Sequence, residues 1–253
     1  MPLHYARRLT GRTRSTRANR HLGFALAFVA GATNAGGYLA VKQYTSHMTG
    51  MVSAMSDNLV LGSYELVGAG FGGLLSFVLG AACSAVMVHL ARRRDMHSEF
   101  ALPLLLEAAL LPCFGVLGSR LSTMEGLFVP ATVMLLCFIM GLQNAVITKL
   151  SHAEIRTTHI TGIVTDIGIE LGKLCYWNAS AGGAATRVVA NRDRLAVLGT
   201  LAASFFVGGV MGALGFKHIG YSATVPLALL LIALAALPAV DDLRALARRM
   251  AGR

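Results

Sequence analysis

The chain has 253 residues, of which 55% are hydrophobic and only 13% charged, and its formal net charge is +10. An average soluble domain carries roughly a quarter of charged residues, so this composition excludes an ordinary soluble domain and favours an integral membrane protein. Lys and Arg stand at the ends of apolar blocks rather than on a basic face with interleaved aromatic residues. We therefore expect no nucleic-acid partner, and the partner indicated by the charge is the lipid bilayer with its anionic headgroups.

Long apolar blocks predict an all-α integral membrane fold with six transmembrane helices. Blocks of about 17 to 25 residues give spans, in chain order, at 22–41, 66–90, 101–118, 127–148, 195–216 and 222–239. Two shorter apolar stretches, 50–62 and 162–175, cannot cross about 30 Å of hydrocarbon at 1.5 Å per residue. We expect them to be half-helices, re-entrant segments or interfacial helices.

Basic residues are distributed unevenly along these spans. If the N-terminus is cytoplasmic, 19 of the 22 Lys and Arg residues fall on the cytoplasmic side, and only Lys42, Arg120 and Lys217 fall outside. This bias predicts cytoplasmic N- and C-termini. The basic segments 1–21 and 241–253 are then a cytoplasmic leader and a cytoplasmic tail, in a multi-pass protein of a bacterial inner membrane.

An internal repeat relates the two halves of the chain, 22–121 and 122–240. GATNAGGY followed by TSHMTG in the first half matches GLQNAVIT followed by TTHITG in the second. The matched pairs are Asn34 with Asn144, His47 with His159, Ser76-Phe77 and Gly80 with Ser204-Phe205 and Gly208, and Pro103 with Pro226. Each half thus reads as span, short helix, span, span. Because three crossings is an odd number, the second half starts on the opposite side, which predicts two inverted three-helix repeats.

These motifs, with the six-span length, resemble the YoaK-type family of small bacterial transmembrane proteins over nearly the whole chain. The resemblance implies a bacterial inner-membrane protein with this two-motif layout. The biochemical function of that family is unassigned, so the resemblance supports the architecture and leaves the activity open.

The two polar motifs are the candidate site. Thr49 and Thr161 are expected to be N-caps of the short helices, which would place free backbone N–H groups near His47 and His159 for an anion. In inverted-repeat transporters such helix ends meet near the midplane of the bilayer. The predicted substrate-binding residues are His47, Thr49, Gly50, His159, Thr161, Gly162, Asn34 and Asn144.

Alternatives stay open for these residues. Histidine changes charge near neutral pH, so the pair could relay protons, or each histidine could simply fix its loop by bonding to backbone. Asn34 and Asn144 could join the repeats or touch substrate. Two histidines without a carboxylate or thiolate cluster make a poor ligand set, and the four cysteines are isolated, so we expect no metal and no cofactor.

Three acidic residues are candidates for proton or ion coupling. Glu107 lies in the third span, where an ionisable residue is costly enough to suggest a functional role. A shallow position in the membrane, or permanent protonation in a helix contact, would also explain its presence there. Asp166 and Glu170 share one face of the second short helix, with Lys173 beyond them. They could hold a coupling cation, or form a charged face in cytoplasmic water.

No phosphate-binding or hydrolase motif occurs, so we expect no enzyme. The favoured function is a transporter or channel for an unidentified small solute, proton-linked in one version, with a site between the repeats. The alternative is a membrane scaffold or regulator in which the His and Thr motifs are structural; an intramembrane enzyme acting on lipid is the third option. A homo-oligomer is suggested only by analogy with channels built from such repeats.

Overall fold

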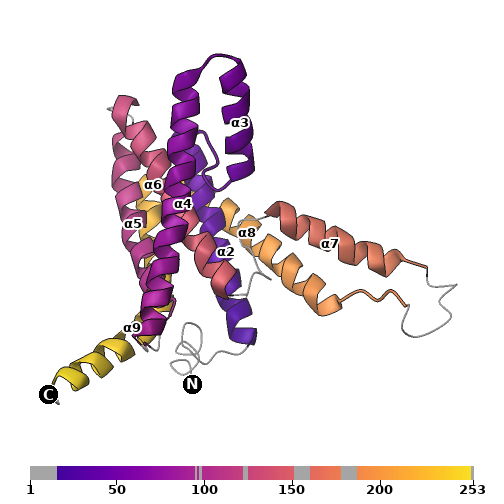
Figure 1. Cartoon of the computed structure of the whole chain (residues 1–253), viewed down its shortest axis with the longest axis vertical. Helices are drawn as coiled ribbons and strands as arrows, with labels where there is room; N and C mark the ends of the chain where they lie inside the picture. Colours follow the sequence, from indigo (N-terminus) through magenta and orange to yellow (C-terminus); the bar gives the residue numbers. More distant parts are fainter. Residues whose placement is uncertain are drawn as a thin grey trace.

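The computed structural model describes residues 16–94, 96, 99–121, 125–150, 160–177 and 187–251, which form helices and their connections (Figure 1). Most helix bounds lie within a few residues of the expected ones. The N-terminal segment contributes to the first helix from Thr16, and the last helix continues through the expected tail to Ala251. The helices are α2 (Thr16–Val41), α3 (Met48–Val60), α4 (Tyr64–Arg93), α5 (Ala101–Arg120), α6 (Glu125–Leu150), α7 (Ile160–Cys175), α8 (Arg192–Ile219) and α9 (Thr224–Ala251), with the 3-10 turn η2 (Gly220–Ala223) between the last two.

Five stretches of the described chain are long and apolar enough to cross a membrane. They are Asn19–Val41, Tyr64–Arg93, Ala101–Arg120, Val129–Lys149 and Arg192–Ala236, the last of which contains α8, η2 and part of α9. The short helices α3, of 13 residues, and α7, of 16, are not among them. The fold thus has the all-helical, apolar character of a membrane protein that the composition predicts.

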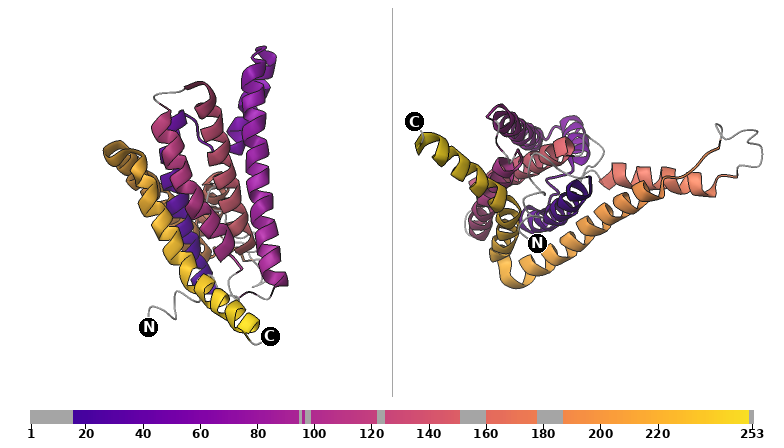
Figure 2. Two further views of the ribbon diagram at one scale, coloured as in Figure 1. Left: turned by 90° about the vertical axis from the view of Figure 1, so that its left-hand side faces the viewer. Right: turned by 90° about the horizontal axis from the view of Figure 1, so that it is seen from below.

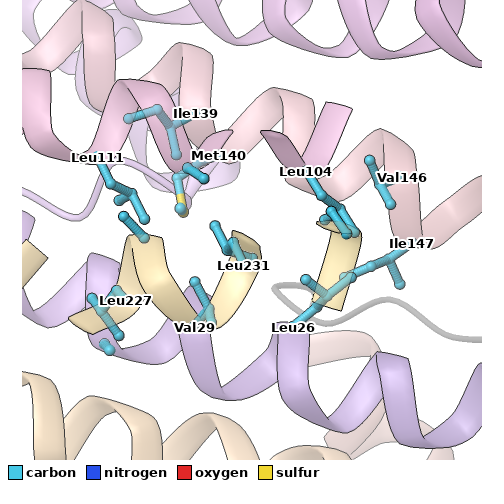
Figure 3. Close-up of a cluster of buried hydrophobic side chains, with 14 of the residues drawn as sticks. Leu26, Val29, Leu104, Leu111, Ile139, Met140, Val146, Ile147, Leu227 and Leu231 are labelled. Carbon is cyan, nitrogen blue, oxygen red and sulfur yellow. The ribbon is translucent and has the colours of Figure 1, made fainter. Parts of the chain in front are cut away.

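The core of the bundle lies between helices that are distant in the sequence. α2 packs mainly against α8, α4 against α6, and α5 against α9. Figure 3 shows aliphatic side chains from four of these helices meeting in one cluster, with Leu26 and Val29 from α2, Leu104 and Leu111 from α5, Ile139, Met140, Val146 and Ile147 from α6, and Leu227 and Leu231 from α9. In water, burying each of these side chains would stabilise the fold by roughly 1.5–3 kcal/mol. Between helices in lipid, close packing of the side chains contributes to stability.

Glycines set the closest crossings of the bundle. At five of them an added Cβ would overlap a backbone carbonyl oxygen of the facing helix, so the two helix backbones touch. The pairs are Gly31 with Phe205, Gly208 with Phe28 and Gly212 with Ala32 between α2 and α8, and Gly141 with Phe77 and Gly80 with Phe138 between α4 and α6. Small residues that allow backbones to approach are the usual means of joining helices in lipid, where the hydrophobic effect gives little attraction between them.

Each short helix packs on the long helix that follows it, α3 on α4 and α7 on α8. Figure 1 shows α3 beside the first part of α4, at the end of the molecule away from both termini. The pair α7 and α8 extends sideways from the bundle, as the view from below shows (Figure 2, right). The two short helices therefore belong to two separate helical hairpins.

Candidate functional site

The first polar motif interrupts the chain between α2 and α3. α2 ends at Val41, and Lys42 adopts a positive φ of 56°, which turns the chain sharply. The rings of Tyr38 and Tyr44 stack with centroids 4.6 Å apart, and the Ser46 hydroxyl donates a hydrogen bond to Asn34 Oδ1 at 3.0 Å. Asn34 therefore holds this connection against α2, within the first half of the chain.

The expectation that Thr49 and Thr161 are N-caps is wrong. α3 begins at Met48, and His47 occupies the N-cap position without a capping bond from its side chain. The backbone N–H of Met51 donates to the His47 carbonyl at 3.1 Å, which places Thr49 inside the first turn. Thr161 likewise lies inside α7, which begins at Ile160. Helical bonding starts too early in the sequence for either threonine to cap it.

His47 lines a cavity of about 500 Å³ beside α3, which we call the α3 cavity. Its ring lies directly over Gly50, where any Cβ would collide with the imidazole Nδ1. The cavity is bounded by the connection after α2, by α3, by the start of α4 and by the first turns of α6. Its lining includes Lys42, His47, Gly50, Met51, Gly70 and Met134.

The second polar motif is described only in part. His159 lies outside the described residues. Thr161 is exposed and Gly162 half-buried in the first turn of α7, and the Thr165 hydroxyl donates to the Thr161 carbonyl at 2.8 Å. These residues belong to the hairpin of α7 and α8, whereas the α3 cavity lies against α4 and α6.

A second cavity, of about 460 Å³, lies between the first turns of α2 and α8, and we call it the α2–α8 cavity. Arg20, His21 and Phe24 line it from α2, and Asp193 and Thr200 from α8. Sequence reasoning missed this cavity because its lining residues come from two segments far apart in the chain, at the starts of α2 and α8.

Asp166 and Glu170 connect α7 to the start of α8. Arg194 donates to Asp166 Oδ2 at 3.0 Å, and Lys173 donates to Glu170 Oε1 at 2.8 Å. The backbone N–H of Asn191, the N-cap residue of α8, donates to Glu170 Oε2 at 2.8 Å. The hydrogen bonds from Lys173 and Asn191 hold the pKa of Glu170 below its ordinary value, so the carboxylate is ionised at neutral pH. Both carboxylates thus join α7 to the start of α8 by hydrogen bonds.

Glu107 is fully buried on α5. Neither of its carboxyl oxygens has a hydrogen-bond partner in the described part of the chain. Its neighbours one turn away on the helix, Leu104 and Leu111, belong to the apolar core (Figure 3). The Glu107 carboxyl is therefore shielded from solvent and without a hydrogen-bond partner in the described part of the chain.

Asn144 and its neighbour Gln143 lie on α6. The Asn144 amide donates to the Met140 carbonyl of its own helix at 2.9 Å. The buried Gln143 amide crosses to α2 and donates to the Leu26 carbonyl at 3.2 Å. Gln143 thus makes a polar link between the two halves, which sequence reasoning missed although Gln143 stands in the GLQNA motif beside the predicted Asn144.

The residues that the structure describes contain no group of three His, Cys, Asp or Glu side chains placed to hold a metal. The structure places His47 and Gly50 at the α3 cavity together with Lys42. Asn34 accepts a hydrogen bond from Ser46, in the connection just before His47. Thr49 is exposed in the first turn of α3. Asp166 and Glu170 lie apart from this cavity, on α7.

Comparison with known proteins gives one match. Neither a curated protein nor a solved structure matches the chain. Residues 22–237 match the family described as protein of unknown function (DUF1275), of which the YoaK-type proteins are members. Since this match covers both halves and all the long helices, the chain belongs to the DUF1275 family.

Proposed function

We propose that the protein is a transporter or channel for a small solute, built from two inverted repeats of three spans in a bacterial inner membrane, with both termini cytoplasmic. The observation that carries the proposal is the α3 cavity. A polar connection interrupts the helical path after α2 and lines this cavity with Lys42 and His47. In a membrane, irregular backbone is tolerated where it faces protein or a water-filled space, which is the setting of a solute site.

Paired helix contacts support the inverted repeat. The contact of α2 with α8 corresponds to that of α6 with α4, because α2 matches α6 and α4 matches α8 in the sequence repeat. Gly31 and Gly141 are equivalent residues, and each meets the carbonyl of an equivalent phenylalanine, Phe205 and Phe77 respectively. An arrangement in which matched residues make matched contacts is what a pseudo-two-fold axis produces.

Helix length supports six spans. The stretch Arg192–Ala236 has 45 residues, which as one helix would be roughly 68 Å long and more than twice the hydrocarbon thickness. Gly220, with φ of 64°, and the turn η2 divide it into α8 and α9. Two spans joined by a tight turn account for this stretch better than one.

The two cavities occupy corresponding places in the two halves. Met134 of the α3 cavity matches Phe24 of the α2–α8 cavity, and Ala69 of the first matches Val197 of the second. With the N-terminus inside, the α2–α8 cavity lies toward the cytoplasm, because it flanks the start of α2. The α3 cavity adjoins the far end of α2. Corresponding cavities toward opposite faces are what two inverted repeats produce.

Glu107 supports proton linkage. An ionised carboxylate without a partner in an apolar core is so costly that the group is protonated in this conformation. A rearrangement that admits water to α5 would release that proton. Its counterpart in the second half, Leu230, cannot do so, and one proton site per chain follows.

Flux into liposomes tests the proposal. Purified protein is reconstituted, and uptake of a panel of small ions and organic solutes is measured with and without a pH gradient. We expect uptake of at least one solute, reduced at least tenfold by His47→Ala and unchanged by His218→Ala, an exposed histidine at the end of α8. Flux that is equal in both variants would remove His47 from the site. No flux for any solute, together with a co-purifying partner protein, would favour the scaffold.

A further inference from the structure

Four sulfur-containing side chains lie against glycines of α4, and we call them the sulfur cluster: Met51 and Met55 from α3, and Met134 and Cys137 from α6. A methyl group added at Gly73 would lie 3.0 Å from Met51 Sδ and 3.4 Å from Cys137 Sγ. One added at Gly70 would lie 3.1 Å from Met55 Sδ. Met51, Met55 and Met134 also line the α3 cavity.

The convergence follows from helix periodicity. Met51 and Met55 are four residues apart and share one face of α3, with His47 one turn before them. Met134 and Cys137 are three apart and share one face of α6. These faces meet over a strip of α4 made of Gly70, Gly72 and Gly73, whose lack of side chains leaves room for the sulfurs.

The second half of the chain shows how the same place is filled when only packing matters. There the matched positions form an aliphatic and aromatic cluster in which leucines replace the glycines. Ile163 and Ile167 stand for Met51 and Met55, Phe24 and Ala27 for Met134 and Cys137, and Leu198 and Leu201 for Gly70 and Gly73. The first half thus carries sulfur-containing side chains where the second carries hydrocarbon side chains alone.

Thioethers and thiols are soft ligands that favour Cu(I) and the chemically similar Ag(I) over hard cations. Thioethers are also uncharged, so they can sit in an apolar helix packing until a cation arrives. The cost of bringing an ion into such surroundings rises steeply with its charge, which favours a monovalent cation. The imidazole of His47 adds a nitrogen ligand at the cavity wall.

We propose that the sulfur cluster, with His47, is a binding site for a soft monovalent cation of the Cu(I) or Ag(I) type. The cation enters through the α3 cavity and is held by two or three of the sulfurs. This inference goes beyond the proposed function, which names no solute, and it concerns binding alone, so either can fail without the other.

Binding of Ag(I) to the purified full-length protein tests the site without a reductant. The other cysteines, Cys83, Cys113 and Cys175, are first replaced by alanine, because exposed thiols would bind silver themselves. In this background we expect one tightly bound Ag(I) by calorimetry, with sulfur neighbours in its X-ray absorption spectrum. Met51→Ile together with Met55→Ile, which introduces the residues of the second half, should weaken binding at least tenfold.

Met211→Leu, at an exposed methionine of α8, is the matched control and should leave binding unchanged. Met134→Leu is a second, single test in case the double variant does not fold, as judged by gel filtration and circular dichroism. The site is refuted if the folded Met51→Ile/Met55→Ile or Met134→Leu protein binds Ag(I) as tightly as the background. Absence of any tight Ag(I) binding in the background protein would refute it as well. Binding that persists in a protein with no flux would support the site and count only against transport.

Discussion

Arg194 in the first turn of α8 donates a hydrogen bond to Asp166 of α7 at 3.0 Å, and its second guanidinium nitrogen lies 4.0 Å from Glu170. One arginine thus reaches two carboxylates of the neighbouring helix. In the first half, Leu66 stands at the position that matches Arg194. The positions that match Asp166 and Glu170 hold Ala54 and Asn58, neither of which is acidic. The two hairpins are therefore held together by different forces.

Arg194→Ala should weaken the α7–α8 hairpin only slightly, by less than about 1 kcal/mol, because the ion pair with Asp166 is half exposed. Glu170→Ala should weaken it more, since the removed carboxylate leaves the Asn191 N–H without its acceptor. Hydrogen exchange of α7 amides measures both effects. Equal protection of α7 in the two variants would contradict this ranking, and Asp57→Ala, on α3, is the control.

Lowering the pH should open the same hairpin. The pKa of Glu170 is depressed by the hydrogen bonds from Lys173 and from Asn191, so the folded form binds a proton less readily than the unfolded form. The stabilisation is complete above the ordinary value of 4.5 and is lost as the pH falls below it, through the folded pKa. Hydrogen exchange of α7 amides, corrected for the intrinsic rate at each pH, should accelerate in that range. In Glu170→Gln the protection of α7 should differ less between pH 6 and pH 3.5 than in the unchanged protein.

Gly31→Ala and Gly141→Ala should each destabilise the bundle, by about 1–3 kcal/mol or more, because the new methyl group meets a carbonyl oxygen of the facing helix. Gly68→Ala is the matched control: nothing lies within 4 Å of its added Cβ, so it should be neutral or stabilising by up to about 1 kcal/mol. Unfolding in increasing dodecyl sulfate, followed by circular dichroism, compares the three. A Gly31→Ala protein as stable as Gly68→Ala would contradict the crossing of α2 and α8.

Glu107→Leu, the residue found at the matched position Leu230, should stabilise the fold by about 1–3 kcal/mol, because it removes a buried carboxyl without partners. If the protein carries a proton-linked flux, the same change should make that flux independent of the pH gradient. Both are read from one preparation, by denaturation and by liposome uptake. A marked loss of stability would show that the Glu107 carboxyl has a partner, and the coupling role would then lose its support.

Much of this architecture could be predicted from the sequence, because hydropathy and charge report directly on membrane spans. The starts and ends of α4, α5 and α6 followed from the apolar blocks. The N-caps at Thr49 and Thr161 did not, since residue preference alone cannot say which carbonyl begins the helical bonding, and His47 took that position in α3. Glu170 could be singled out by its residue type, yet the hydrogen bond that it accepts from Asn191 depends on how α7 lies against α8.

The site was predicted unevenly for the same reason. His47 and Gly50 are at a cavity as the motif suggested, but the cavity is completed by Met51, Met55 and Met134, which resemble ordinary apolar residues in a sequence. Only the meeting of α3 with α4 and α6 reveals that their sulfurs converge. Gln143 was overlooked because its contact with Leu26 spans the whole first half of the chain.

The difference between the two hairpins means that they respond to different changes in the surroundings. Dissolved salt screens the attraction between Arg194 and Asp166 that holds α7 to α8, because both side chains are partly in contact with water. They have little effect on α3, which is packed on α4 through glycine and methionine. High hydrostatic pressure should affect the hairpin of α3 and α4 instead, because it favours filling or closing the cavity beside Met51 and Met55. Salt therefore acts mainly on the hairpin of α7 and α8, and pressure mainly on that of α3 and α4.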